Sequence, residues 1–259
     1  MKKNDLILII TVLAVLAASV PLILLSRAPK DAPDDRFAEL SASDIPSDSD
    51  VSDSDVSATD ADAGPVFVEA DKSYFDDALF IGDSRTDELR TYGTLDNADY
   101  FSATGTTVYK IFEDRIKVKD VGSVTLDELL AKKKYGKIYV MLGFNEIGYN
   151  RNKTIKKYGE VLDRISSAQP DAVIYVMTNL LVSQIHDSKS KYEKSADIIE
   201  LNRMITEMAE ERGFCCLDVN PLFCDNGFLR AELTGDGVHL YAKYSKNWCD
   251  WLCEHTVEE

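Results

Sequence analysis

Residues 78–90 read ALFIGDSRTDELR, an apolar run that passes through Gly82, Asp83 and Ser84 into a polar segment. The run 78–82 is rich in bulky apolar residues and too short for a helix, which favours a buried strand. The polar segment that follows is predicted to be helical. Ser84 therefore lies at a strand-to-helix turn, where free backbone N–H groups stabilise negative charge on a reacting group. Taken alone, the Gly-Asp-Ser triplet is a weak signal, because Asp and Ser are also ordinary helix caps.

The same alternation continues towards the C-terminus. Further short apolar runs are predicted as strands at residues 100–103, 137–143, 172–178 and 214–219. Amphipathic segments are predicted as helices at residues 125–133, 154–168, 195–212 and 242–255. The third of these carries apolar residues at helical spacing, namely Ile198, Leu201, Ile205 and Met208. Strands that alternate with helices indicate a parallel sheet covered on both faces, and such sheets bind ligands at the carboxyl ends of their strands.

An uncharged apolar run occupies residues 6–25 and is long enough, at about 30 Å, to cross a bilayer as a helix. Lys2 and Lys3 precede it, so the positive-inside rule keeps the N-terminus in the cytoplasm. A cleaved signal peptide is the alternative, although the run exceeds a typical h-region and no clear A-x-A site follows it. We predict a single-pass anchor over residues 1–27 that holds an extracellular domain at the cell membrane. Cleavage would instead release the same domain as a secreted protein.

Residues 28–72 are predicted to be a disordered linker. Its centre, SASDIPSDSDVSDSDVSATDAD at 41–62, has almost nothing to bury, and its like charges repel one another. Calcium binding by the Asp-x-Asp spacings is a less favoured alternative to a solvated spacer. Residues 31–72 contribute −11 of the chain's net charge of −16, so the folded domain predicted at 73–259 is only mildly acidic. No basic stripe appears, which makes a nucleic-acid partner improbable.

Polar residues suited to catalysis follow other predicted strands. Gly105 ends the second strand and Asn145 follows the third, where a backbone N–H and a side-chain amide can face an oxyanion. His239 stands three residues after Asp236 in a Gly-rich loop, and a hydrogen bond between them would fix the imidazole tautomer. A general base beside a serine needs such a bond. Each of these residues alone is also compatible with an ordinary turn or loop.

Together, four motifs resemble the blocks of the SGNH (GDSL-like) hydrolase family: FIGDSRT (80–86), ATG (103–105), GFNE (143–146) and DGVH (236–239). The resemblance covers roughly residues 74–251. It implies a three-layer α/β/α flavodoxin-like fold with about five parallel strands. It also implies that Ser84 is the nucleophile, His239 the general base and Asp236 its orienting partner. Gly105 and Asn145 would complete an oxyanion hole with the N–H of Ser84, and no metal or organic cofactor is needed.

Two departures from related patterns bear on this resemblance. Glu146 stands where many SGNH members have Asp, at a position that is not usually catalytic. The Gly-x-Ser-x-Gly elbow of ordinary α/β-hydrolases is absent around Ser84, which disfavours that family.

The predicted anchor and linker place the domain outside the membrane. Combined with the resemblance, they favour an extracytoplasmic serine esterase that removes O-acetyl groups from a carbohydrate of the bacterial cell envelope. A lysophospholipase or lipase acting at the bilayer is an alternative, and acyl transfer between sugars uses the same chemistry. A catalytically silent polysaccharide-binding module is the non-enzymatic alternative, which a reactive-serine probe would distinguish.

The remaining histidines and the cysteines carry weaker signals. His186 and His255 are expected at the surface, and no spacing typical of a metal site appears. Cys215 and Cys216 are adjacent on a predicted strand, so their side chains should point to opposite faces of the sheet. Cys224, Cys249 and Cys253 complete an odd set of five. We expect mostly buried free thiols, although export would allow Cys215 or Cys216 to pair with Cys224.

Overall fold

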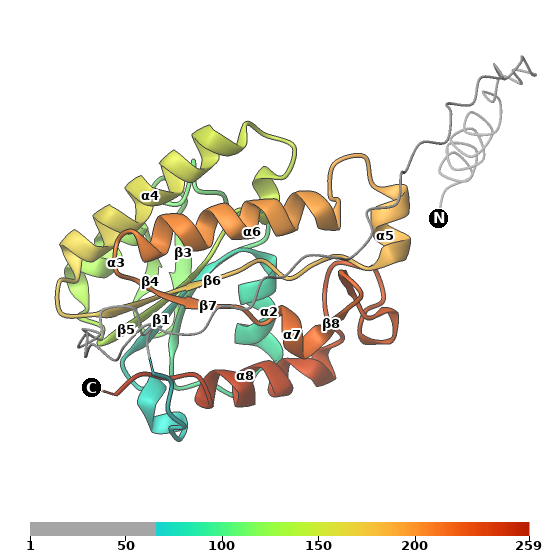
Figure 1. The fold of residues 1–259 in the computed structure, drawn as a ribbon. Coiled ribbons are helices and arrows are strands. Elements are labelled where there is room, and N and C mark those ends of the chain that lie inside the picture. The colour runs from blue at the N-terminus through green and yellow to red at the C-terminus, as the bar shows by residue number, and fades with distance from the viewer. Residues whose placement is uncertain (1–65, 259) are drawn as a thin grey trace, which may run out of the picture. The chain divides into compact units, whose positions relative to one another are not determined.

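The computed structural model describes residues 66–258, so the predicted anchor and most of the predicted linker lie outside the described residues. Its centre is a five-stranded parallel sheet with the strand order β2-β1-β5-β6-β7 (Figure 1). These strands are β1 (Ala78–Gly82), β2 (Asp99–Ser102), β5 (Lys137–Met141), β6 (Val173–Met177) and β7 (Cys215–Leu217). Both ends of all five strands lie within two residues of the ends predicted from the sequence. The prediction of an α/β fold with about five parallel strands is confirmed.

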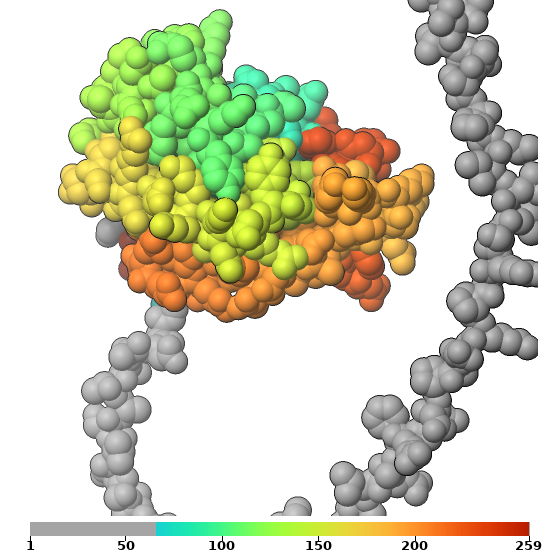
Figure 2. All heavy atoms as spheres, turned by 90° about the horizontal axis from the view of Figure 1, so that it is seen from above, coloured from blue at the N-terminus to red at the C-terminus, as the bar shows by residue number. Residues whose placement is uncertain are grey.

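Helices cover both faces of the sheet and give three layers. One face carries α3 (Leu126–Lys132), α4 (Arg151–Ala168) and α6 (Ser195–Glu210). The other carries α2 (Ser84–Tyr92), α7 (Asn220–Phe223) and α8 (Ser245–Cys253). Figure 2 looks onto the first layer, where α4 (yellow) and α6 (orange) lie side by side.

Alternation along the strands divides the core into two parts. On β1, Leu79 and Ile81 pack towards α3, α4 and α6, whereas Phe80 packs towards α2 and α8. On this second face, Tyr139 stacks between Phe80 and Tyr175 with ring centroids 4.6 and 4.4 Å apart. Such offset aromatic contacts add to the stabilisation that burial of the rings provides. The sheet is thus a rigid platform for the loops at its carboxyl edge.

Strand order places a switch point at the carboxyl ends of β1 and β5. The chain leaves β1 towards β2 on one side, and then returns to add β5 on the other side of β1. Loops that leave the sheet in opposite directions open a crevice between them, and this crevice is the usual ligand site of such sheets. Ser84 follows β1 and Asn145 lies just after β5, so both border the crevice.

Several short elements were not predicted, because they carry no apolar periodicity of useful length. These are η1 (Lys72–Phe75), the hairpin β3 (Ile116–Val118) with β4 (Gly122–Val124), η2 (Phe144–Glu146), α5 (Gln184–Lys189), α7, the hairpin β8 (Cys224–Asp225) with β9 (Phe228–Leu229) and η3 (Ala231–Leu233). The predicted helix at 242–255 is divided into η4 (Ala242–Tyr244) and α8. Helix α4 begins three residues before its predicted start because the side chain of Asn150 caps it, accepting a bond from the Lys153 N–H.

The prediction of mostly buried free thiols is confirmed only in part. All five are free thiols, but only Cys249 is fully buried. Cys215 and Cys216 pack on opposite sides of the sheet, as expected for neighbours on a strand. Burial raises the pKa of Cys216 to about 12 and that of Cys224 to about 11, so both are protonated at neutral pH. No helix within residues 66–258 is long and apolar enough to cross a membrane.

Candidate active site

Ser84 is the first residue of α2, at the tight turn that leaves β1. The turn requires glycine before it, because a Cβ at Gly82 would lie 2.0 Å from the Thr86 hydroxyl and 2.8 Å from the Met141 carbonyl oxygen. Asp83 caps the helix by accepting a hydrogen bond from the Arg85 N–H at 3.0 Å. Its carboxyl group is buried, and desolvation raises its pKa despite the opposing effect of Arg85. These constraints hold the Ser84 hydroxyl at the helix N-terminus and at the carboxyl edge of the sheet.

A hydrogen-bonded chain links Ser84 to two residues from the C-terminal part of the sequence. The Oγ of Ser84 lies 2.9 Å from Nε2 of His239, and Nδ1 of the same ring lies 2.7 Å from Oδ2 of Asp236. Nucleophile, base and orienting carboxylate therefore stand in the order that serine hydrolases use. The structure brings together all three residues that the sequence analysis selected.

The loop itself holds Asp236 ionised. Oδ1 of Asp236 accepts the N–H groups of Val238 and His239, both at 2.8 Å, while Oδ2 faces the imidazole. Partial burial works to raise the pKa of Asp236, but these hydrogen bonds outweigh it and hold the pKa well below its usual value. Gly237 permits the tight loop, since its φ of +87° is a conformation that favours glycine.

The proposed oxyanion residues border the same crevice. Gly105 has a φ of +80° and lies in an exposed loop, with no atom within 4 Å of the position that a Cβ would take. The amide of Asn145 donates to the Thr106 carbonyl oxygen at 2.9 Å and reaches Oδ2 of Asp83 at 3.4 Å. The second contact is long, so that amide hydrogen is only weakly engaged. Asn145 thus ties the Gly105 loop to the helix cap next to Ser84.

Glu146 has a structural role that the sequence did not reveal. Its side chain is buried, and Oε1 accepts the Val108 N–H at 2.5 Å, which fixes the loop that follows Gly105. Oε2 has no hydrogen-bond partner among the described residues. Desolvation raises the pKa of Glu146 to about 7. Glu146 was expected to be unimportant because its position is not usually catalytic, but its carboxylate holds the Val108 N–H.

Arg85 is the second residue that the sequence analysis missed. A charged residue just after a helix start suggests an exposed side chain, but Arg85 is almost fully buried. Its guanidinium stacks on Phe144, 3.8 Å from the ring centroid, and Nε donates to the Val238 carbonyl oxygen at 3.3 Å. Arg85 therefore contacts the residues that precede Asn145 and His239. Burial lowers its pKa, and the carboxylates of Asp83 and Glu88 oppose that effect.

Glu88 lies one helical turn after Ser84 and is partly buried. Desolvation raises its pKa to about 7, while His239 and Arg85 act to lower it. A carboxyl group that ionises near neutral pH therefore sits within electrostatic range of the imidazole. Nothing in its helical position distinguished Glu88 from a solvent-exposed residue in the sequence.

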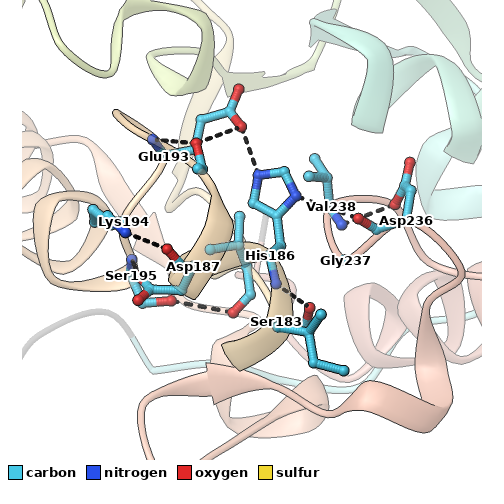
Figure 3. A network of polar contacts seen from close by, with 12 residues as sticks. Ser183, His186, Asp187, Glu193, Lys194, Ser195, Asp236, Gly237 and Val238 are labelled. Atoms are coloured by element: carbon cyan, nitrogen blue, oxygen red, sulfur yellow. Dashed lines mark hydrogen bonds and ion pairs between the residues drawn. The ribbon is translucent and has the colours of Figure 1, made fainter. Parts of the chain in front are cut away.

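His186 was expected at the surface, and the structure shows it partly buried in a polar network. Its imidazole is about one-fifth exposed and lies between Glu193 and the loop of Asp236 (Figure 3). Nε2 contacts the Glu193 carboxylate at 2.6 Å, and Nδ1 contacts the Asp236 carbonyl oxygen at 3.3 Å. Gly237 is required here too, because a Cβ would lie 2.6 Å from the Cβ of His186. The segment that contains α5 thus packs against the loop that carries Asp236 and His239.

His255 makes different contacts: it stacks on Trp251 with ring centroids 4.0 Å apart. Within residues 66–258, no group of three or more His, Cys, Asp or Glu side chains is arranged to hold a metal ion.

A parallel sheet with serine, histidine and aspartate hydrogen-bonded at its carboxyl edge has the arrangement of a serine hydrolase. A family model described as the GDSL-like lipase/acylhydrolase family matches residues 80–244, more than half of the chain. The chain belongs to this family and is an esterase, as the four sequence motifs predicted. No curated protein matches it.

Solved structures share the fold at low sequence identity. A Streptococcus pneumonia protein described as a platelet activating factor is 19% identical, with a TM-score of 0.55, covering 68% of this chain and 86% of its own. An acylhydrolase from Bacteroides fragilis is 15% identical, with a TM-score of 0.52 and coverage of 68% and 83%. A GDSL-like lipase from Bacteroides thetaiotaomicron is 16% identical, with a TM-score of 0.51 and coverage of 73% and 88%. At these identities the likeness extends to the fold alone.

Proposed function

We propose that this esterase removes short acyl groups, above all O-acetyl groups, from a carbohydrate of the cell envelope. The catalytic part of this proposal rests on the hydrogen-bonded chain from Ser84 through His239 to Asp236. The location outside the cell is inferred from the apolar run at 6–25 and the acidic linker, which lie outside the described residues.

In the first half of the reaction, Oγ of Ser84 attacks the ester carbonyl carbon while Nε2 of His239 takes the hydroxyl proton. Asp236 accepts the Nδ1–H bond and stabilises the imidazolium that forms. The N–H groups of Ser84 and Gly105 and the amide of Asn145 stabilise the oxyanion. The weakly held amide hydrogen of Asn145 is the one available for this purpose.

In the second half, Nε2 of His239 returns its proton to the departing sugar oxygen, which leaves an acyl-enzyme on Ser84. Water then attacks the acyl carbon, with His239 again accepting a proton. Breakdown of the second tetrahedral intermediate releases the carboxylic acid and restores the Ser84 hydroxyl.

Exposure of the site supports a bulky substrate. The side chain of Asp236 is 56% exposed and that of His239 is 32% exposed. Such an open rim allows an acyl group to reach Ser84 while the polymer that carries it remains in solvent. A lysophospholipid is the second candidate from the sequence, but no described feature of the site favours it over a carbohydrate ester.

Hydrolysis of p-nitrophenyl acetate and butyrate by the full-length chain tests the proposal, beside Ser84→Ala and the matched control Ser123→Ala at an exposed serine. We expect Ser84→Ala alone to lose activity and fluorophosphonate labelling, with acetate preferred by the wild type. A folded wild-type chain that neither hydrolyses these esters nor reacts with the probe would refute the serine mechanism. A clear preference for butyrate would leave the mechanism intact and argue against deacetylation.

A further inference from the structure

Three tyrosines with exposed side chains lie in the segments that follow Gly105, Asn145 and α5. Tyr109 is 38% exposed, Tyr149 is 59% exposed and Tyr192 is 53% exposed. We propose that this tyrosine surface binds the sugar rings of the carbohydrate chain whose ester is cleaved at Ser84. The inference rests on the proposed function and adds to it a binding site for the polymer.

Two of the tyrosines belong to the loops that carry the oxyanion residues. Tyr109 is the fourth residue after Gly105, and Tyr149 is the fourth residue after Asn145. Their rings contact each other with centroids 6.1 Å apart. The Tyr109 hydroxyl lies 3.1 Å from that of Thr154 in α4, which fixes the ring at the start of this helix. The pair is thus built on the same loops as the predicted oxyanion hole.

Tyr192 belongs to the segment between α5 and α6 and packs against the loop that contains Gly148 and Tyr149. A Cβ at Gly148 would stand 3.1 Å from the ring of Tyr192, so the ring rests on glycine backbone. Gly148 also has a φ of +95°, which favours glycine. An ion pair between Arg151 and Asp197 joins the starts of α4 and α6 nearby. These segments adjoin on the face shown in Figure 2.

A cavity of about 600 Å³ continues from Tyr149 along this face. Its lining includes the polar side chains of Asn150, Asn152, Glu200 and Arg203. Sugar hydroxyls are both donors and acceptors, and amide, carboxylate and guanidinium groups together meet both needs. Arg203 forms ion pairs with Glu200 and Glu207, and Asn150 caps α4, so the lining is a charged and polar surface that a lipid acyl chain would have to desolvate.

Exposed tyrosines suit a sugar ring for a physical reason. One face of a pyranose presents several C–H groups, which pack on the electron-rich face of an aromatic ring. Tyrosine offers that face with little loss of conformational entropy, and its hydroxyl remains in water. Large exposed side chains that cluster next to a catalytic crevice are typical of ligand-binding surfaces.

The test compares acetylated hexasaccharides with the matching acetylated monosaccharides, using xylose, glucose and N-acetylglucosamine backbones and the full-length chain. For at least one backbone we expect kcat/KM for the hexamer to exceed that for the monomer by about tenfold, as expected for a few added ring contacts. Tyr149→Ala with Tyr192→Ala should reduce this ratio to about one. Tyr149→Phe with Tyr192→Phe should retain most of it, because the rings remain. Tyr92→Ala is the matched control, since Tyr92 is 54% exposed at the opposite end of α2 from Ser84.

A ratio near one in the wild type for all three backbones would overturn the proposal. So would a ratio that the double alanine variant leaves unchanged. Absence of all esterase activity would instead count against the proposed function. In that case calorimetric titration with the unesterified hexasaccharides tests the tyrosine surface directly. Binding to the wild type that is lost in the double alanine variant would support the proposal. No binding to the wild type would refute it.

Discussion

Nε of Arg85 donates a hydrogen bond to the carbonyl oxygen of Val238, and this bond joins the residue after Ser84 to the residue before His239. The two catalytic blocks are separated by about 150 residues of sequence, and this bond adds to the Ser84–His239 contact between them. Because this buried guanidinium also stacks on Phe144, Arg85 is a positioning group that joins the Ser84 turn to the loops of Asn145 and His239.

Two replacements of Arg85 distinguish the effect of its charge from the effect of its planar donor geometry. Arg85→Met should lower the Tm, and by more as the pH rises, because burial raises the pKa of Asp83 and the variant removes the cation that stabilises its charged form. Arg85→Lys keeps a charge but lacks the planar donor geometry, so it should recover most of the Tm. Both variants should lose about tenfold in kcat on p-nitrophenyl acetate, with less change in KM. Full activity in a folded Arg85→Met protein would contradict the role.

Asp236→Asn should lower kcat by about a thousandfold or more at neutral pH. Its remaining oxygen can still accept the N–H groups of Val238 and His239, so the loop should keep its shape. Its amide would then face Nδ1 of His239 as a donor and favour the wrong imidazole tautomer. Steady-state kinetics, with exposed Asp225→Asn as the control, measure the effect. A loss of less than about tenfold would mean that Asp236 does not orient the base.

Asn145→Ala should lower kcat by about a hundredfold to a thousandfold, the usual cost of one oxyanion donor. KM for small esters should change little, because the amide bonds the oxygen chiefly in the transition state. The Tm must be compared as well, since the same amide also holds the Thr106 carbonyl oxygen. An Asn145→Ala protein that retains more than one-third of the wild-type kcat would exclude Asn145 from the oxyanion hole.

The buried carboxyl of Glu146 makes stability depend on pH. Its pKa is about 7 in the folded protein, against an ordinary value of 4.5. As pH rises between these values, the unfolded chain loses the proton first, so the free energy of unfolding falls over this window and levels off above about pH 7. Glu146→Gln imitates the protonated form and still accepts the Val108 N–H. We expect it to be several degrees more stable than the wild type at pH 8 and about equal at about pH 4, below both pKa values, as measured by thermal unfolding.

Glu88 has a similarly raised pKa and contributes the same trend to both proteins, so the difference between wild type and Glu146→Gln isolates Glu146. An equal Tm difference at both pH values would show that Glu146 does not titrate in this range.

The sequence by itself determined the sheet, its helices and the residues that meet at its carboxyl edge. Short buried strands and amphipathic helices have distinct periodicities in the sequence. The carboxyl ends of parallel strands lie at one edge of the sheet, whatever path the loops take. Ser84, Gly105 and Asn145 were therefore placed near one another by strand position, and Asp236 was paired with His239 by local spacing. Their catalytic roles, and the anchor at 6–25, stay predictions.

Only the tertiary structure decided the second group of residues: the burial of Arg85, the reach of Glu146 to Val108, and the packing of His186 against the loop of Asp236. It also decided that Tyr149 and Tyr192 lie on one loop surface. These relationships join segments whose separation in sequence carries no periodic signal. They depend on the paths of irregular loops, which are fixed by the packing of the whole domain rather than by local residue preferences.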